Sequence, residues 1–220
     1  MADSAVSLEP RREIPQVLID SLSGRGLAKT WAASADPVSD LRAECRAIRV
    51  SPEWRRDGSR YLDSYPIIRE SLESVLAQRA MAAGVRWQST AVALQPLARR
   101  GWHIGRWLPT FLLIDGPLGR LLRDRNSPIN ACLKRSPREF PLLASARDAF
   151  NSDLFRRVRN GFGHWSFQWR DEPGVSWITI VHWETGAVEA SLSLLEAEAL
   201  HVLSFAVIET IDKEILAPLA

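Results

Sequence analysis

The spacing of apolar residues predicts an amphipathic helix over residues 67–83. Apolar side chains at Ile68, Leu72, Val75 and Leu76 recur three or four positions apart, so they lie along one face of a helix. Polar and charged residues fill most of the positions between them. We expect the apolar face to pack against the rest of the protein.

A second long helix is predicted over residues 142–161. Phe150, Leu154 and Val158 repeat at every fourth position, which indicates one buried stripe. Gly161 and Gly163 follow this stripe and should loosen or end the helix.

The period of the pattern then changes from four to two, which is typical of β-strands. Polar turns are expected at 171–174 and 184–186, so residues of about 165–192 should form a three-stranded antiparallel β-meander. We interpret the alternating aromatic residues as the buried face of this sheet; the alternative is that they stack on nucleic-acid bases. The alternating positions of the first two runs are Trp165, Phe167, Trp169, Trp177, Thr179, Val181 and Trp183.

A long closing helix is predicted to begin at a capping box formed by Ser193 and Glu196 and to extend to about Leu216. In this motif the serine oxygen accepts an early backbone N–H and the glutamate reaches back to the serine N–H. The expected buried face consists of Leu195, Ala199, Val202, Leu203 and Ala206.

Glycine and proline divide the remainder of the chain. Residues 1–12 should be a disordered lead, and residues 13–66 an irregular, partly helical region. Within that region we expect short helices broken at Gly24, Gly26 and Pro37, and a loop over 52–66 with a turn at Asp57–Gly58. Residues 67–220 should form one helical domain: a helix over 87–97, two short helices or one kinked helix over 101–125, and a loop-rich stretch over 126–141. The fold class is therefore mainly α, a helical bundle with a small β-meander inserted before the last long helix.

Composition excludes several classes of protein. Hydrophobic residues make up 46% of the 220 positions, enough for a sizeable core, yet the sequence has no apolar run of about 18 residues that would span a membrane. Cys45 and Cys132 lack the spacing of a zinc module or a disulfide framework. The first twelve residues do not resemble a signal peptide, so we expect a cytoplasmic protein without a membrane partner.

Charge is unevenly distributed along the chain. Residues 95–140 hold nine basic residues against three acidic ones, whereas residues 171–220 hold nine acidic residues against Lys213 alone. This asymmetry favours a surface that faces a polyanion and a separate acidic face. Arginine accounts for 25 of the 28 basic residues, which suits phosphate binding but is also typical of a GC-rich genome.

One group of residues carries specific chemistry. Asn160 and His164 are four apart, so on a helix they share a face, and Arg159 precedes them directly. Arginine binds phosphate, histidine exchanges a proton near neutral pH, and asparagine holds a phosphate oxygen or orients the imidazole. These three residues suit cleavage of RNA by its own 2′-hydroxyl group, a reaction that needs no metal.

The segment from Arg159 to His164 resembles the RNxxxH motif of the HEPN superfamily and matches the common form of that motif. The resemblance covers about residues 142–216, with residues 67–83 as a candidate addition, and it makes the β-meander an insertion. It implies an α-helical bundle that forms a homodimer, with two motifs meeting in a composite cleft. Many members are metal-independent endoribonucleases of toxin–antitoxin or anti-phage systems, so the resemblance also implies RNA as substrate, no cofactor or metal, and an antitoxin as a further partner.

The resemblance predicts Arg159, Asn160 and His164 as catalytic residues. Arg156, Arg157 and Trp165 are expected to extend the substrate-binding surface, and His182 is a second candidate for proton transfer. One alternative is a HEPN fold without catalysis that binds RNA or a protein. Another is an unrelated helical protein, in which the arginine stabilises the end of a helix and the histidine begins a strand.

Overall fold

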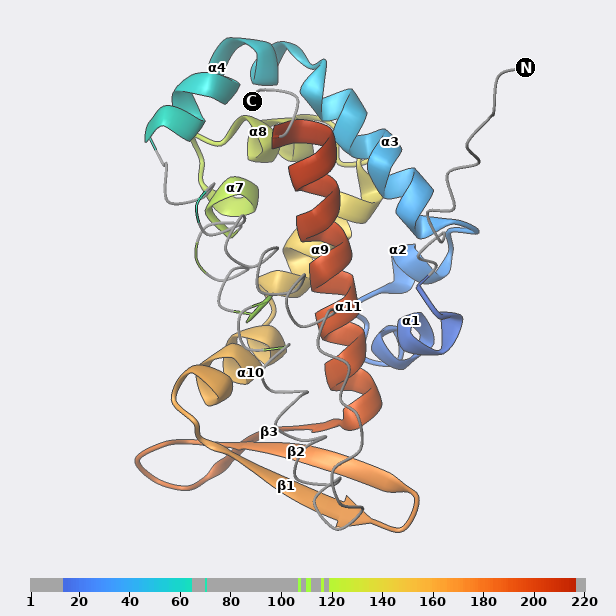
Figure 1. Cartoon of the computed structure of the whole chain (residues 1–220), viewed down its shortest axis with the longest axis vertical. Coiled ribbons are helices and arrows are strands. Elements are labelled where there is room, and N and C mark those ends of the chain that lie inside the picture. Colours follow the sequence, from blue (N-terminus) through green and yellow to red (C-terminus); the bar gives the residue numbers. More distant parts are fainter. Residues whose placement is uncertain are drawn as a thin grey trace, which may run out of the picture.

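The computed structural model describes residues 14–64, 70, 107, 110, 111, 116 and 119–216. It is mainly helical, with a three-stranded sheet before the last long helix, as the sequence predicts (Figure 1). The elements are α1 (Gln16–Ser23), α2 (Lys29–Ala32), α3 (Pro37–Arg49), α4 (Pro52–Ser64), α7 (Gly119–Arg123), α8 (Pro128–Arg135), α9 (Pro141–Phe150), α10 (Asp153–Gly163), β1 (Phe167–Glu172), β2 (Val175–Val181), β3 (Val188–Ser193) and α11 (Leu194–Ile211). A short π-helical turn, Asp212–Leu216, continues α11.

Helix α11 runs through the middle of the molecule, with α1, α3 and α9 packed around it and the sheet below it (Figure 1). The predicted capping box is present: the Ser193 side chain accepts from the Glu196 N–H, and the Glu196 side chain accepts from the Ser193 N–H. The predicted buried face was partly wrong, because Leu195 is 42% exposed while Leu200, Val207 and Ile208 are buried. Elements pack on several sides of α11, so it lacks the single apolar stripe of a surface helix.

Two stretches expected to be loops are helices. Residues 52–64 form α4 and residues 128–135 form α8, each beginning at a proline. Proline fits the first helical position, because its missing N–H would have no helical partner there. The side-chain oxygens of Ser51 and Ser127 accept backbone N–H groups three residues later, which caps both helices.

The single helix expected over residues 142–161 is two helices. Helix α9 ends at Phe150, and α10 begins after Ser152, whose side chain accepts from the Phe155 N–H. The buried residues of α10 are therefore Phe155, Val158 and Phe162, and the expected stripe member Leu154 is only half-buried. Local capping by Ser152 outweighs the continuous apolar spacing across it.

The sheet is the predicted meander, with strand order β1-β2-β3 and antiparallel pairing throughout. The register pairs Phe167 with Ile180 and Trp169 with Ile178, so these residues share the face that covers the core. In β2 this overturns the expected buried face, because Ile178 and Ile180 are fully buried while Trp177, Thr179 and Val181 lie on the opposite, outer face.

Several predictions fall outside the described residues. These are the lead at 1–12, the helices at 67–83 and 87–97, and most of the segment 101–125. In residues 14–50, the predicted breaks separate the helices: α1 ends just before Gly24, α2 lies between Gly26 and Pro37, and α3 begins at Pro37. No helix within the described part of the chain has the length and apolar character needed to cross a bilayer.

Candidate functional site

Helix α10 holds the Arg159–His164 segment and is fixed to the core by aromatic residues. Phe155 and Phe162 both contact Phe111, with ring centroids 5.6 Å and 5.7 Å away. Phe162 also contacts Phe167 of β1 at 4.8 Å and Trp107 at 5.9 Å. These contacts fix which side of α10 faces inward, and therefore which side faces solvent.

The three motif residues do not share one face of α10. An α-helix turns by about 100° per residue, so Asn160 and His164 lie about 40° apart, opposite the buried Phe155–Phe162 side. Arg159 lies about 140° from His164 around the axis, beside the buried side. The Nε atom of Arg159 is screened from solvent, whereas His164 is exposed. The structure therefore brings Asn160 and His164 together and places Arg159 on a different side.

His164 is the C-terminal cap of α10, and its backbone N–H donates to the Asn160 carbonyl at 2.9 Å. It does not begin a strand, because β1 starts three residues later at Phe167. This finding overturns one part of the alternative in which the motif has no chemical role.

Trp165 has an unusual backbone conformation. Its N–H donates to the Phe162 carbonyl, and the Ser166 N–H donates to the Gly161 carbonyl. These two bonds define a Schellman motif, in which the residue after the cap adopts a left-handed conformation and is usually glycine. Here that residue is Trp165, with φ of +56° and 66% of its surface exposed. The helix end thus directs a large aromatic side chain into solvent next to His164.

A second exposed tryptophan reaches His164 from the sheet. The ring of Trp183 stacks on that of His164, with centroids 6.3 Å apart and planes 22° apart, and 65% of Trp183 is exposed. Trp183 lies in the β2–β3 turn, which Figure 1 shows at the same end of the sheet as the α10–β1 connection. The alternating pattern predicted Trp183 on a strand and gave no link to the motif, because no local signal in the sequence pairs residues 164 and 183.

His182 stabilises the same turn through its side chain. Its Nδ1 atom accepts backbone N–H groups of Glu184 and Thr185, each at 3.3 Å. Its ring lies 6.4 Å from that of Trp183. His182 therefore holds the turn that presents Trp183, and its Nδ1 lone pair is occupied.

Arg156 and Arg157, predicted to extend the binding surface, both form ion pairs with Asp153. Arg157 also donates through Nη1 to the Glu189 carbonyl of β3 at 2.9 Å, which joins α10 to the sheet. By helical geometry Arg157 is about 20° from His164 around the axis and about 10 Å before it along the axis, so it lies on the His164 side of α10. These two arginines lower the pKa of Asp153 through hydrogen bonds, which keeps that carboxylate charged.

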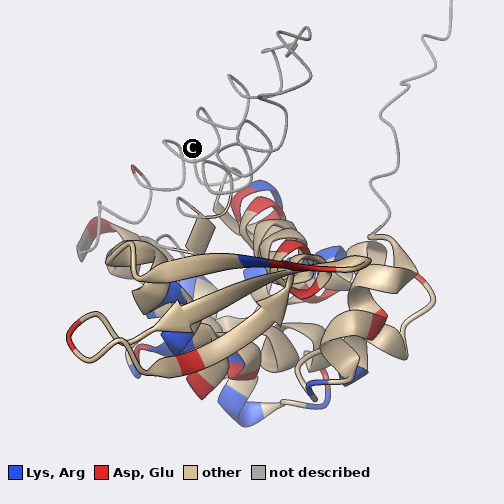
Figure 2. Ribbon diagram, turned by 90° about the horizontal axis from the view of Figure 1, so that it is seen from below, with Lys and Arg blue, Asp and Glu red and all other residues tan. Residues whose placement is uncertain are grey.

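Charge across the molecule is more mixed than the sequence suggests. Three carboxylates of the acidic C-terminal segment form ion pairs: Glu196 with Arg25, Glu214 with Arg46, and Glu209 with Lys213. Strand β2 has no charged residue, and in Figure 2 the charged stretches of the sheet lie on its other strands and on one turn. The face near the motif is thus defined more by aromatic rings than by net charge.

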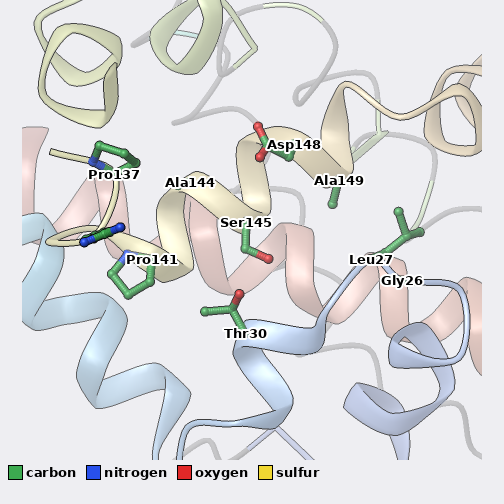
Figure 3. A pocket seen from close by; sticks show the side chains of 10 residues that line it. Gly26, Leu27, Thr30, Pro137, Pro141, Ala144, Ser145, Asp148 and Ala149 are labelled. Carbon is green, nitrogen blue, oxygen red and sulfur yellow. The ribbon is translucent and has the colours of Figure 1, made fainter. Parts of the chain in front are cut away.

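A separate hollow of about 450 Å³ lies between α2 and α9. Thr30 and Ser145 face one another across it, and Pro137 and Pro141 line one end (Figure 3). None of the motif residues lines this hollow. Over the described ranges, no three His, Cys, Asp or Glu side chains gather as a set of metal ligands would.

No protein-family model, curated protein or solved structure matches this chain. Conclusions about function therefore rest on the residues at the end of α10 and on their surroundings.

Proposed function

We propose that the protein is a metal-independent endoribonuclease of the HEPN type. The observation that carries this proposal is the exposed imidazole of His164 on the last turn of α10, beside Asn160 and on the same side as Arg157. An exposed proton-transfer group beside a polar side chain is part of what RNA cleavage requires, and a cation that binds the phosphate completes the set. The setting is the cytoplasm, in a toxin–antitoxin or anti-phage system with an antitoxin as partner.

The reaction follows from the chemistry of these groups. His164 takes the proton of a ribose 2′-hydroxyl, and the 2′-oxygen attacks the adjacent phosphorus. The bond between phosphorus and the 5′-oxygen breaks, and that oxygen leaves with a proton supplied by an acid. The products are one RNA with a 2′,3′-cyclic phosphate and one with a 5′-hydroxyl. Arg159 binds the phosphate and offsets the charge of the transition state, while Asn160 orients the reacting groups.

The proposal assigns the site to two copies of the chain. Within one copy, Arg159 and His164 diverge by about 140° around α10, so they are poorly placed to act on the same phosphate. A homodimer that apposes two α10 ends supplies the arginine from one copy and the histidine from the other. Mixing Arg159→Ala and His164→Ala proteins, unfolded and refolded together, should then recover cleavage that neither variant has alone.

The decisive experiment measures cleavage of labelled total RNA, with EDTA present, by the wild type and by His164→Ala. We expect wild-type cleavage to leave 2′,3′-cyclic phosphate ends, and the rate to fall by about 100-fold or more in the variant. Since His164 is exposed, the variant should keep the wild-type melting temperature. Equal cleavage by both proteins would remove His164 from the mechanism.

Arg125→Ala is a matched control, because Arg125 belongs to the other Arg-Asn pair of the chain. Arg125 is exposed in the turn between α7 and α8, and Asn130 occupies the position that corresponds to His164. We expect this variant to cleave RNA at the wild-type rate. RNA binding without cleavage by the wild type would favour the second candidate, a non-catalytic HEPN-fold module. That candidate is consistent with the pairing of Arg156 and Arg157 to Asp153.

A further inference from the structure

We infer that Trp183, which lies against His164, and Trp165, which follows His164 along the chain, form a base-stacking platform, and that the substrate is RNA with unpaired bases at the cleavage point. The inference rests on the proposed function for the identity of the reaction. The binding surface is independent of the proposed function, because it is argued from the exposure and geometry of the two rings.

Trp183 is already arranged for stacking. Its ring lies nearly parallel to that of His164 and offset from it, with centroids 6.3 Å apart, and most of the indole remains open to solvent. A base that stacks on the exposed indole would lie one ring beyond His164. The neighbouring ribose and phosphate would then be close to the imidazole. Because every base has a π-face, such stacking orients a strand without selecting its sequence.

The unfavourable backbone conformation of Trp165 also supports a role in base stacking. A residue other than glycine in the left-handed region is disfavoured, and a residue 66% exposed regains little of that cost by burial. Gly163 lies two residues earlier in α10 and Gly161 four earlier, yet the left-handed position itself holds tryptophan. Strain of this kind concentrates at functional sites. The adjacent contact, with Phe167 at 6.0 Å, fixes one side of the Trp165 ring.

Nucleic acid is the occupant that suits these surroundings best. Arg157 lies on the His164 side of α10 and Arg156 precedes it, and these two guanidinium groups share one carboxylate, Asp153. The cluster therefore keeps a net positive charge for phosphates near the aromatic faces for bases. That combination is characteristic of proteins that bind single strands. Bases within a duplex are stacked on each other and present no free face, so duplex RNA should bind this surface poorly.

The test measures binding of a short fluorescent RNA that is 2′-O-methylated throughout and so cannot be cleaved. We expect Trp183→Ala and Trp165→Gly each to weaken binding of the single strand about tenfold. Trp177→Ala is the matched control, since Trp177 lies on the outer face of the same sheet, about 20 Å from Trp183 along the strand. A duplex of the same sequence should bind the wild type about tenfold more weakly than the single strand.

A second RNA with abasic sites separates stacking from phosphate attraction. Abasic RNA should bind the wild type about tenfold more weakly than intact RNA binds it. The Trp183→Ala protein should bind the two RNAs with almost equal affinity. Unchanged RNA affinity in both tryptophan variants would overturn the inference, even if the wild type cleaves RNA. Tryptophan-dependent binding without cleavage would uphold it and refute the ribonuclease. A change in the mass of the assembly, with RNA affinity unaltered, would assign the surface to a second copy of the chain.

Discussion

Gly161 of the motif helix packs against Ile180 of the sheet with no room for a side chain. A methyl group at Gly161 would lie 2.5 Å from Cγ2 of Ile180 and 2.8 Å from its Cδ1. Ile180 is fully buried and has little room to move. The position directly after Asn160 is therefore occupied by glycine because α10 packs directly on β2, and this contact sets the height of His164 above the sheet.

Gly161→Ala is expected to destabilise the protein by about 1–3 kcal/mol through overpacking. This exceeds the roughly 1 kcal/mol that alanine gains over glycine inside a helix, so the net effect is a loss. Gly163→Ala is the control, because Gly163 is exposed on the same helix and its substitution should be neutral or stabilising. Urea unfolding of both variants measures the difference, and a Gly161→Ala protein as stable as the wild type would contradict the packing described.

Trp165→Gly should stabilise the protein by about 1 kcal/mol. Glycine adopts the left-handed conformation without strain, and removal of a mostly exposed ring loses little burial. Trp165→Ala removes the same ring and keeps the strain, so it should not gain stability. Thermal unfolding of the three proteins tests this ranking, and an equal gain for both variants would show that the backbone conformation is not the cause.

The burial of Glu44 leads us to expect that the free energy of unfolding falls as pH rises. Burial raises the pKa of this carboxyl, although the N–H groups of Leu142 and Leu143 at the start of α9 donate to it at 2.8 Å and 2.9 Å and lower it. The folded state thus holds the Glu44 proton to higher pH than the unfolded chain. As pH rises from the ordinary value of 4.5 through the raised pKa, the charged form reduces the free energy of unfolding.

Glu44→Gln removes this titration, so the wild type should lose stability relative to the variant as pH rises from 4 to 8. Glu44→Ala should cost about 1–3 kcal/mol at every pH, because two N–H groups of α9 lose their acceptor. Chemical unfolding of the three proteins across that range gives the comparison. A constant difference between wild type and Glu44→Gln would show that Glu44 does not titrate as described.

The contribution of Glu196 to the free energy of unfolding should show the opposite pH dependence. Its partial burial raises the pKa, but hydrogen bonds from Arg25 and Ser193 outweigh that effect and the net pKa is lowered. The stabilising charge is present above the ordinary value of 4.5 and disappears as pH falls through the lowered pKa. Glu196→Gln should be about 1 kcal/mol less stable at neutral pH, and this gap should narrow on acidification. A gap that stays the same down to pH 3 would contradict the role of the charge.

Sequence patterns predicted the closing helix and the meander because their signals are local. The Ser193–Glu196 capping box and the turns around 173–174 and 184–186 depend on residues next to one another. The prolines were misleading for a physical reason. Pro52 and Pro128 disfavour a helix before them but fit the first position of a helix after them. The preceding serine, whose side chain caps that helix, is what distinguishes a helix start from a loop here.

The candidate site was predictable only in part. The chemistry of Arg159, Asn160 and His164 follows from residue types and spacing, and their place at a helix end is confirmed. The contact between Trp183 and His164 depends on the register of β1 with β2, which returns the chain to α10 nineteen residues later. An alternating pattern also cannot say which face of a strand is buried when both are apolar, as Ile178 beside Trp177 illustrates.

The position of Trp183 in a turn has a consequence for how such a protein diversifies. A connection between strands tolerates insertions, deletions and substitutions far better than a helix packed into a core. In a ribonuclease of the proposed kind, His164 ends a helix that is packed into the core and tolerates few substitutions. The Trp183 ring, which would contact the substrate, lies in a turn that tolerates many. In such a ribonuclease, substitutions within residues 182–187 would change how strongly a base stacks, while α10 and its packing on the sheet stay as they are.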